Sequence, residues 1–328
     1  MYQSYPSSRQ ADLLLFADFA VPEEPRRLLV TTHGWHGQIK KAHSDNVPTG
    51  AVPQDWFQIS VEMRGRGDSG GRPDCNGWEL QDVVDAVAFA RRTFADQILD
   101  PHLVTLVGGS GGGSNVMGLL GKFPDFFCRA RAECGVSDFA VWYRNDTVGE
   151  FRDEMDVWMG TTPDLGPEAY ASRGGVTTAG NLCTPILLIH GDRDPRVPVE
   201  QSRLFVDAAR RTGKAHLVTY YELKGVGYPG HFGGITPAQE EFRKREGDAF
   251  IAAPPVPAAI PEKGFFTVAG FIRTRHFEVE LENINRVGEL HYDLSKNSFK
   301  LYTLKPSVAR LRVRLADGRW ETRELASC

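Results

Sequence analysis

Short apolar runs alternate with amphipathic stretches along most of the chain. Runs rich in aliphatic and β-branched residues predict five strands, at 27–33, 57–63, 100–107, 185–191 and 215–223. Apolar spacings of three and four residues predict helices at 79–94 and 199–213, and Gly213 ends the second helix. Strands that are apolar on both faces and alternate with such helices are typical of a parallel sheet covered on both sides. The pattern therefore predicts an α/β fold, whose sheet starts with two antiparallel strands at 12–21 and 28–33.

The composition changes near residue 251, where a run of prolines and alanines begins. Such a run favours a stiff, extended connector, which we place at 251–263. Beyond it, roughly six short alternating runs with turn signals at SKN and ADG predict strands. The sequence therefore divides into a larger α/β domain at 1–250, the connector, and a small all-β domain at 264–328.

The sequence leaves the role of the small β domain open. Arg310, Arg312 and Arg314 alternate along one predicted strand, which is typical of a solvated strand face. A module that binds carbohydrate or a protein partner is the alternative. The domain is equally suited to shaping the entrance of a site in the larger domain, or to forming a homo-oligomer.

The stretch GGSGGGSN at 108–115 has the composition of a flexible linker, but its neighbours indicate a different role. It follows a predicted strand directly and precedes a stretch with helical spacing. A strand, a sharp glycine-rich turn and a helix, with G-x-S-x-G at 108–112, form the pattern of a nucleophile elbow. There a serine occupies a strained backbone position and small neighbours allow close packing. Ser110 is the candidate nucleophile, whereas Ser114 fails the pattern because Val116 stands where the second glycine is required.

Partners for this serine follow later in the chain, in the order that the same fold requires. Asp194 lies in a loop after a predicted strand, within HGDRDPRVP, and is the candidate acid; a turn or helix-capping role is the alternative. His231 lies in a Gly/Pro-rich loop after the next strand and is the candidate base; a plain surface histidine is the alternative. We expect His33 and His190, which also lie at strand ends, to orient loops. The order serine, aspartate, histidine predicts a catalytic triad of Ser110, Asp194 and His231.

An oxyanion hole needs two N–H donors close to the nucleophile. Gly111 directly follows Ser110 and supplies one backbone N–H. The turn HGWHG at 33–37 follows the first predicted parallel strand, and we assign the second N–H to Trp35. A role in packing alone is the alternative for this turn. The rings of Trp35 and His36 would overhang the pocket, so one of them is a candidate for lining the substrate site.

Four further residues are candidates for substrate binding. Glu62 and Arg64 follow a predicted strand beside the pocket, where they bind a charged substrate end or form a structural ion pair. Trp142 and Tyr143 lie in the segment 138–160, which departs from the rhythm of strands and helices and predicts a lid. Aromatic core packing is the alternative for these two residues.

Composition narrows the classes of function. The 328 residues are 41% hydrophobic, carry a formal net charge of -4 and contain no long basic cluster, which argues against nucleic acid as a partner. We find no run of about 18 apolar residues and no signal peptide, so we expect a cytoplasmic protein without a membrane span. Secretion with a removed signal is the alternative. The five cysteines lack metal-ligand spacing, so we expect no metal and mostly reduced thiols, with a Cys128–Cys134 disulfide as the alternative.

Several of these stretches together resemble a known family. HGWHG, MRGRGDSGG, ELQDVVDAV, GGSGGGSN, CTPILLIHGDRDPRVPVEQSRLF and GHFGG, in this order over roughly residues 10–250, are similar to the catalytic domain of the prolyl oligopeptidase-like (S9) group of α/β-hydrolases. The resemblance implies an α/β-hydrolase fold, to which the small C-terminal all-β domain is added. It implies a Ser-Asp-His hydrolase of peptide or ester bonds that needs no metal or organic cofactor. It also implies a folding role for the loop GRGDS, rather than adhesion.

Three departures from this family shape our functional hypothesis. Gly109 and Gly111 flank Ser110, where peptidases of this group usually carry a large residue. The hydrolase signals begin within the first ~30 residues, so we expect no N-terminal β-propeller, and the β domain at 264–328 is additional. These departures favour hydrolysis of a carboxylic ester or related acyl bond, with a small ester or short peptide as substrate. A prolyl-oligopeptidase-type peptidase is the alternative, and a non-catalytic binding protein is a remote one.

Overall fold

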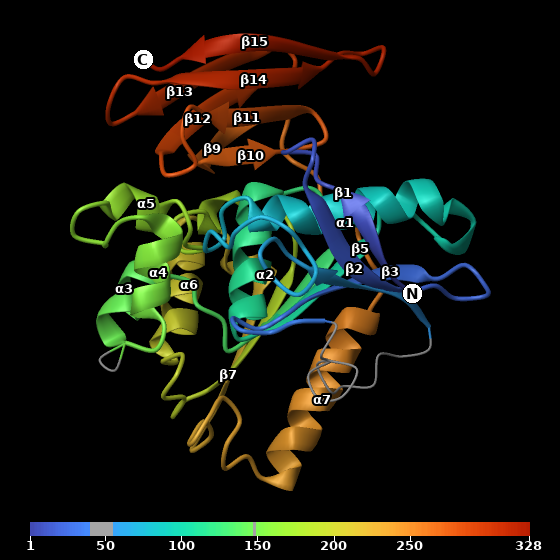
Figure 1. Ribbon diagram of the computed structural model, residues 1–328, viewed down its shortest axis with the longest axis vertical. Coiled ribbons are helices and arrows are strands. Elements are labelled where there is room, and N and C mark those ends of the chain that lie inside the picture. The colour runs from blue at the N-terminus through green and yellow to red at the C-terminus, as the bar shows by residue number, and fades with distance from the viewer. Residues whose placement is uncertain (40–54, 147–148) are drawn as a thin grey trace.

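The computed structural model describes residues 1–39, 55–146 and 149–328 (Figure 1). An α/β body is built on an eight-stranded sheet, and a second, seven-stranded sheet lies over one side of it. Among the described residues, no helix is long and apolar enough to cross a membrane. All five cysteines are free thiols, so the alternative of a Cys128–Cys134 disulfide is wrong.

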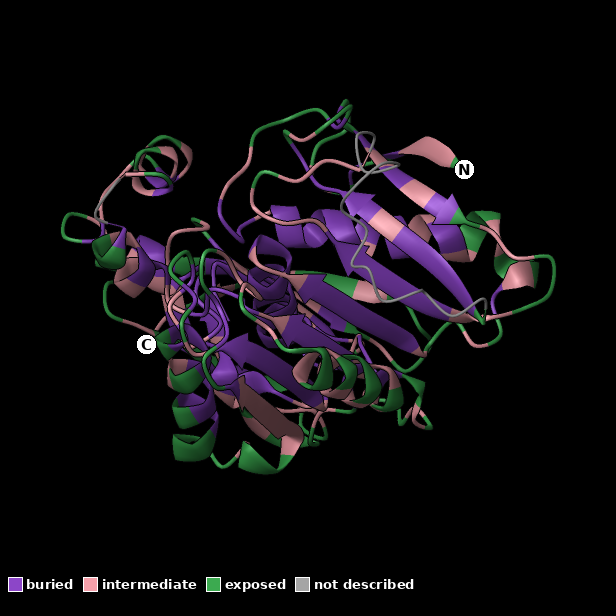
Figure 2. Cartoon of the chain, turned by 90° about the horizontal axis from the view of Figure 1, so that it is seen from below, coloured by how far each residue is buried: buried purple, intermediate pink, exposed green. Residues whose placement is uncertain are grey.

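The larger sheet has the strand order β1-β2-β4-β3-β5-β6-β7-β8. Its strands are β1 (Tyr2–Pro6), β2 (Leu14–Ala20), β3 (Arg27–Thr32), β4 (Trp56–Glu62), β5 (Val104–Gly109), β6 (Arg129–Glu133), β7 (Ile186–Gly191) and β8 (Val218–Leu223). From β4 to β8 all neighbours are parallel, whereas β1 and β2 are antiparallel. Figure 2 shows that the central strands are buried along their length. The predicted α/β-hydrolase fold is confirmed.

The predicted antiparallel start of the sheet is half right. β2 pairs antiparallel with β4, as expected. The second strand of the prediction, β3, instead runs parallel to both β4 and β5. The chain passes from β2 to β3 and then to β4, and β4 lies between β2 and β3 in the sheet. The antiparallel edge strand is β1, which the pattern did not predict. With both faces covered by packed side chains, β3 carries the uniform apolar run typical of a central parallel strand.

Helices cover both faces of the sheet. The helices are α1 (Glu79–Thr93), α2 (Gly111–Lys122), α3 (Phe139–Asn145), α4 (Arg152–Met159), α5 (Pro167–Ala171), α6 (Glu200–Arg211) and α7 (Pro237–Ala252), with short 3₁₀ turns at Ala95–Gln97, Ala179–Asn181 and Ala215–Leu217. α1, α2 and α6 share one core with the sheet, and α7 packs against the opposite face. Every residue of α2 is buried, so this helix, which follows the glycine-rich turn, lies inside the molecule rather than on its surface.

The C-terminal sheet has the order β13-β12-β9-β10-β11-β14-β15, with antiparallel neighbours throughout. Its strands are β9 (Lys263–Ala269), β10 (Phe271–Arg273), β11 (Phe277–Leu281), β12 (Val287–Asp293), β13 (Ser298–Thr303), β14 (Val308–Arg314) and β15 (Trp320–Ala326). There are seven strands rather than six, because Gly270, with a φ of 75°, divides the first predicted strand. Alternate side chains of this sheet enclose a separate core. A β-bridge between Leu301 of β13 and Ser327, which follows β15, connects the two edges of the sheet.

The two sheets are joined by buried contacts. Phe271 of β10 is fully buried in the core of the α/β body, and its ring stacks on Trp78 with 4.8 Å between centroids. Lys122, at the end of α2, donates hydrogen bonds to the carbonyl oxygens of Ser172 and Ala269. At the connector, α7 continues through Ala252, and an extended segment leads from there to β9.

Candidate active site

Ser110 lies in the sharp turn between β5 and α2, at the carboxyl end of a central parallel strand. Its φ of 56° and ψ of -125° are strained for a residue with a side chain. The Ser110 N–H donates to the Glu133 carbonyl oxygen at 2.8 Å, which holds the turn against the next strand. A Cβ atom at Gly108 would lie 2.3 Å from the carbonyl oxygen of Gly112, so the crossing of strand and helix requires glycine. GGSGGGSN is therefore a rigid turn and not a linker.

Ser110, His231 and Asp194 form a hydrogen-bonded line. Ser110 Oγ lies 2.8 Å from His231 Nε2, and His231 Nδ1 lies 2.6 Å from Asp194 Oδ2. The serine follows β5, the aspartate follows β7 and the histidine lies in the loop after β8. Because β5, β7 and β8 run parallel in one sheet, their carboxyl ends meet at the same edge.

The Asp194 carboxylate is fixed and ionised by its surroundings. Its side chain is fully shielded from solvent, and Oδ1 accepts hydrogen bonds from the N–H groups of Arg196 and Val197. Burial on its own would raise the pKa of Asp194, but the imidazoles of His190 and His231 and the Val197 N–H lower it well below its usual range. His190 also contacts Ser202 and the Val197 carbonyl oxygen, each at 2.8 Å, so it orients this loop as expected.

Two backbone N–H groups converge beside the serine. A Cβ atom at Gly111 would lie 2.4 Å from the Trp35 nitrogen, so the turn after β3 packs directly against the first residue of α2. Within the described part of the chain, neither N–H donates a hydrogen bond. Two unpaired donors next to a hydroxyl form an arrangement that can bind an oxyanion.

The side chain of Trp35 leads away from this turn into an aromatic cluster. The indole contacts the rings of Trp142 and Trp158, with centroids 4.9 and 5.0 Å away. Its Nε1 donates to Glu154 Oε2 at 2.5 Å, and His36 Nε2 lies 2.9 Å from the same oxygen. Glu154 thereby joins α4 to the turn, a contact between residues 119 apart in sequence.

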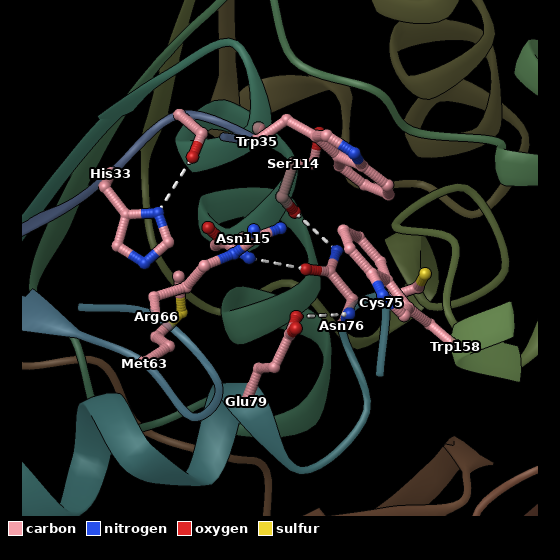
Figure 3. Close-up of a pocket in the computed structure, with 12 residues that line it drawn as sticks. His33, Trp35, Met63, Arg66, Cys75, Asn76, Glu79, Ser114, Asn115 and Trp158 are labelled. Atoms are coloured by element: carbon pink, nitrogen blue, oxygen red, sulfur yellow. Dashed lines mark hydrogen bonds between the residues drawn. The ribbon is translucent and has the colours of Figure 1, made fainter. Parts of the chain in front are cut away.

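A narrow cavity opens beside the Trp35 and Gly111 N–H groups (Figure 3). The interior open to a water-sized molecule is about 20 Å³, within an empty volume of about 320 Å³ that includes the mouth. It is lined by His33, Gly34, Trp35, Met63, Arg66, Cys75, Asn76, Glu79, Gly111, Ser114, Asn115 and Trp158. Burial lowers the pKa of His33 to about 4, so this imidazole is neutral at pH 7. Burial and the nearby Asp74 raise the pKa of Glu79 to about 7.

Glu62 and Arg64 have structural partners instead of facing the cavity. Arg64 makes a bidentate ion pair with the buried Asp82, with Nε and Nη2 at 2.8 and 2.5 Å from its oxygens. Glu62 is fully buried and accepts hydrogen bonds from the N–H groups of Ile39 and Asp68, and from the Tyr2 hydroxyl. The structure therefore favours the structural alternative, in which Arg64 forms an ion pair with Asp82 and Glu62 is held by hydrogen bonds.

Within the predicted lid at 138–160, Phe139–Asn145 form α3 and Arg152–Met159 form α4, and residues 147–148 lie outside the described part of the chain. Trp142 is 2% exposed, and its Nε1 donates to the Arg196 carbonyl oxygen at 2.8 Å, so the core-packing alternative holds for this residue. Tyr143 donates to Asp156 at 3.2 Å and its ring packs against Tyr170. Neither of the two lines the cavity.

Two side chains near the site, Arg66 and Glu154, escaped the sequence analysis. Arg66 follows β4 within the loop GRGDS, and this strand ends at the same edge of the sheet as β5. That position was a usable signal, since the carboxyl ends of parallel strands carry ligand-binding residues. Glu154 had no such signal, because only the packing of α4 over the turn after β3 brings it to Trp35.

Comparison with known proteins agrees with this geometry. The model of the prolyl oligopeptidase family (Peptidase_S9) matches residues 62–241, which is more than half of the chain. Esterase LipC of Mycobacterium tuberculosis is 26% identical over 225 residues, which cover 63% of this chain and 54% of that protein. The uncharacterized peptidase YuxL of Bacillus subtilis is 28% identical over 169 residues, which cover 50% of this chain and 24% of that protein. The chain thus spans between about a quarter and about half of the length of these curated relatives.

Solved structures share the fold. The acylaminoacyl peptidase of Pyrococcus horikoshii matches with a TM-score of 0.58 and 19% identity, over 77% of this chain and 42% of that chain. Esterases and peptidases therefore both stand among the proteins similar to this one. The chain belongs to the prolyl oligopeptidase (S9) family of serine hydrolases, with an α/β-hydrolase fold.

Proposed function

We propose that this protein hydrolyses a carboxylic ester or related acyl bond, with Ser110 as the nucleophile. The observation that carries the proposal is the continuous line of hydrogen bonds from Ser110 through His231 to the ionised Asp194. His231 Nε2 removes the hydroxyl proton as Ser110 Oγ attacks the carbonyl carbon. Asp194 holds the ring in the tautomer that this step needs, and it stabilises the imidazolium that forms.

In this proposal the N–H groups of Gly111 and Trp35 bind the oxyanion of the tetrahedral intermediate. His231 then gives its proton to the leaving alcohol, and an acyl group remains on Ser110. Water, deprotonated by the same imidazole, attacks the acyl-enzyme and releases the acid. Glu154 acts as a positioning residue, because it fixes the indole of the residue that supplies the second N–H.

An ester is favoured over a peptide bond by what surrounds the triad. A peptidase that acts at a chain end needs a charged group to bind that end, and Glu62 and Arg64 were the candidates. Both charges are taken up by structural partners. The cavity also holds Arg66, but a cation repels the positively charged amino end of a peptide. The prolyl-oligopeptidase-type activity stays the second candidate, since YuxL is described as a peptidase.

Hydrolysis of p-nitrophenyl butyrate beside a panel of aminoacyl-p-nitroanilides tests the proposal. We expect ester turnover by the wild type, little anilide cleavage, and loss of ester turnover in Ser110→Ala. Ser298→Ala is the matched control, because Ser298 is an exposed serine of β13 that does not line the cavity. Anilide cleavage that matches ester turnover would make the protein a peptidase, and full ester turnover by Ser110→Ala would remove the proposed nucleophile.

A further inference from the structure

Arg66 is the cationic side chain of the cavity beside the Trp35 and Gly111 N–H groups. It is half-buried, and its guanidinium lies 4.7 Å from the centroid of the Trp158 ring. Figure 3 shows Arg66 beside His33 and Asn115 in the wall of this cavity. A guanidinium that stacks on an indole keeps its N–H donors free at its edge.

Within the described part of the chain, the guanidinium of Arg66 makes no ion pair and no hydrogen bond. The nearby charges are otherwise occupied. Arg64 pairs with Asp82, and Glu154 accepts from Trp35. Glu79, the acidic residue of the cavity wall, accepts the N–H groups of Asp74 and Asn76 with its two oxygens. Among the described residues, the guanidinium of Arg66 is thus paired with no carboxylate, and its donors are available to a ligand at the cavity.

The loop that carries Arg66 is held in place. The Arg66 N–H donates to the Met63 carbonyl oxygen at 3.2 Å, and the Ser69 N–H donates back to the Arg66 carbonyl oxygen at 2.9 Å. Beneath the loop, the Glu62 carboxylate accepts the N–H groups of Asp68 and Ile39. Glu62 thus joins the Arg66 loop to the segment that carries Trp35. A cation fixed in this way binds a ligand at a lower cost in conformational entropy.

The cavity lies on the acyl side of the substrate. The leaving group must lie against His231, because His231 gives it a proton. Neither His231 nor any residue of the Asp194 loop lines the cavity, whereas the oxyanion donors Trp35 and Gly111 do. Its interior has room for little more than one water molecule, so the terminal group of a substrate stays at the mouth of the cavity.

We propose that Arg66 selects substrates whose acyl group ends in a carboxylate, that is, monoesters of short dicarboxylic acids. This inference rests on the hydrolase activity proposed above and names its substrate class. The carboxylate of the acyl group pairs with the guanidinium at the mouth of the cavity, while the ester carbonyl lies at the N–H groups of Trp35 and Gly111. Pairing of this kind raises kcat/KM for the anionic ester and leaves the neutral ester unchanged.

Mono-p-nitrophenyl esters of glutaric and adipic acid, each beside its neutral methyl ester, test the proposal with spontaneous hydrolysis subtracted. We expect the wild type to prefer the anionic ester, and Arg66→Gln to lower kcat/KM for it by about 10- to 100-fold. We expect the same variant to hydrolyse the methyl ester at close to the wild-type rate. The preference falls at 0.5 M salt, because a half-buried pair is partly screened. Arg66→Lys keeps part of the preference, since it keeps the charge but not the fork of donors.

Arg72→Gln is the matched control, because Arg72 is exposed, lies six residues further along and does not line the cavity. It removes the same charge and should leave both rates unchanged. Equal rates on anionic and neutral esters in the wild type, or an equal loss on both in Arg66→Gln, would overturn the inference while the hydrolase function stands. If Ser110→Ala still hydrolyses the esters, the proposed function fails instead.

Discussion

Gly109 and Gly111 stand on either side of Ser110, but the structure gives them different amounts of room. A Cβ atom at Gly109 would meet its nearest neighbour, the Glu133 carbonyl oxygen, at 3.9 Å, which is an ordinary contact. At Gly111 the nearest atom is the Trp35 nitrogen, at 2.4 Å. The two glycines thus have different roles. Gly109 leaves space beside the nucleophile, and Gly111 allows the two N–H donors to converge.

We expect Gly111→Ala to lower kcat by about 10²- to 10³-fold, because its Cβ displaces the Trp35 N–H from the oxyanion position. Gly109→Ala should change kcat by less than about threefold, since its Cβ fits without movement. Steady-state kinetics on one ester, with circular dichroism as a check on folding, measures both. Equal losses in the two variants would count against Trp35 as a donor.

The residues of the site differed in how far the sequence could predict them. Ser110, Asp194 and His231 each follow a strand in a fixed chain order, so a local pattern was enough to find the three groups that the structure brings together. Trp142 was ambiguous, because an aromatic side chain that lines a pocket and one that fills a core have the same local pattern. Arg66 had a signal that we did not use, and it became visible only through its unpaired charge.

At the scale of elements, a buried ion pair joins β4 to α1. Arg64 follows β4 and Asp82 lies in the first turn of α1; the Asp82 side chain is fully shielded and that of Arg64 nearly so. Burial raises the pKa of Asp82 to about 6, although Arg64 opposes the shift. The pair fixes the strand end from which the Arg66 loop begins.

We expect Arg64→Met to destabilise the fold by about 3–5 kcal/mol at pH 8, because it leaves the buried Asp82 without its positively charged partner. Without Arg64, the pKa of Asp82 rises further, so the folded state binds a proton more tightly than the unfolded state does. The loss is therefore largest at pH 8 and shrinks as the pH falls to 5, where Asp82 is protonated. Urea unfolding at both pH values measures it. A stable variant with a raised KM would instead support a role in substrate binding.

The order of elements was predicted better than their pairing. The predicted strands correspond to β3, β4, β5, β7 and β8 and the predicted helices to α1 and α6, all close to the predicted positions. β6, between β5 and β7, was not among the predicted strands. The predicted direction of β3 was wrong, because the pairing of strands depends on the tertiary structure. An apolar run does not indicate which strand lies beside it. β1 escaped prediction because it is a short edge strand with half-buried polar residues.

On the scale of the whole molecule, the two sheets share a core. Phe271 belongs to the C-terminal sheet, yet its ring is fully buried among residues of the α/β body and stacks on Trp78. Arg9 and Glu280 add a bidentate ion pair across the same boundary, at 2.7 and 2.6 Å. The β domain is therefore a fixed part of the structure that supports α1 and α2, the second of which carries Ser110 at its start.

We expect Phe271→Ala to lower the free energy of unfolding by about 3–5 kcal/mol, because it opens a cavity between the sheets. Phe265→Ala is the matched control: it removes a ring from the neighbouring strand β9 that is 61% exposed, and should change stability by about 0.5 kcal/mol or less. Calorimetry should show one transition for the wild type. Two separate transitions, with only the C-terminal one shifted in Phe271→Ala, would mean that the domains unfold independently.

The central claim is that Ser110 is the activated nucleophile of this hydrolase. A fluorophosphonate reacts covalently only with a serine whose proton is removed by a neighbouring base, and peptide mass spectrometry locates the adduct. We expect a stoichiometric adduct on Ser110 in the wild type, and slow labelling in His231→Ala, which lacks the base at 2.8 Å. An adduct on another serine, or labelling of Ser110 that is unchanged in His231→Ala, would contradict the account.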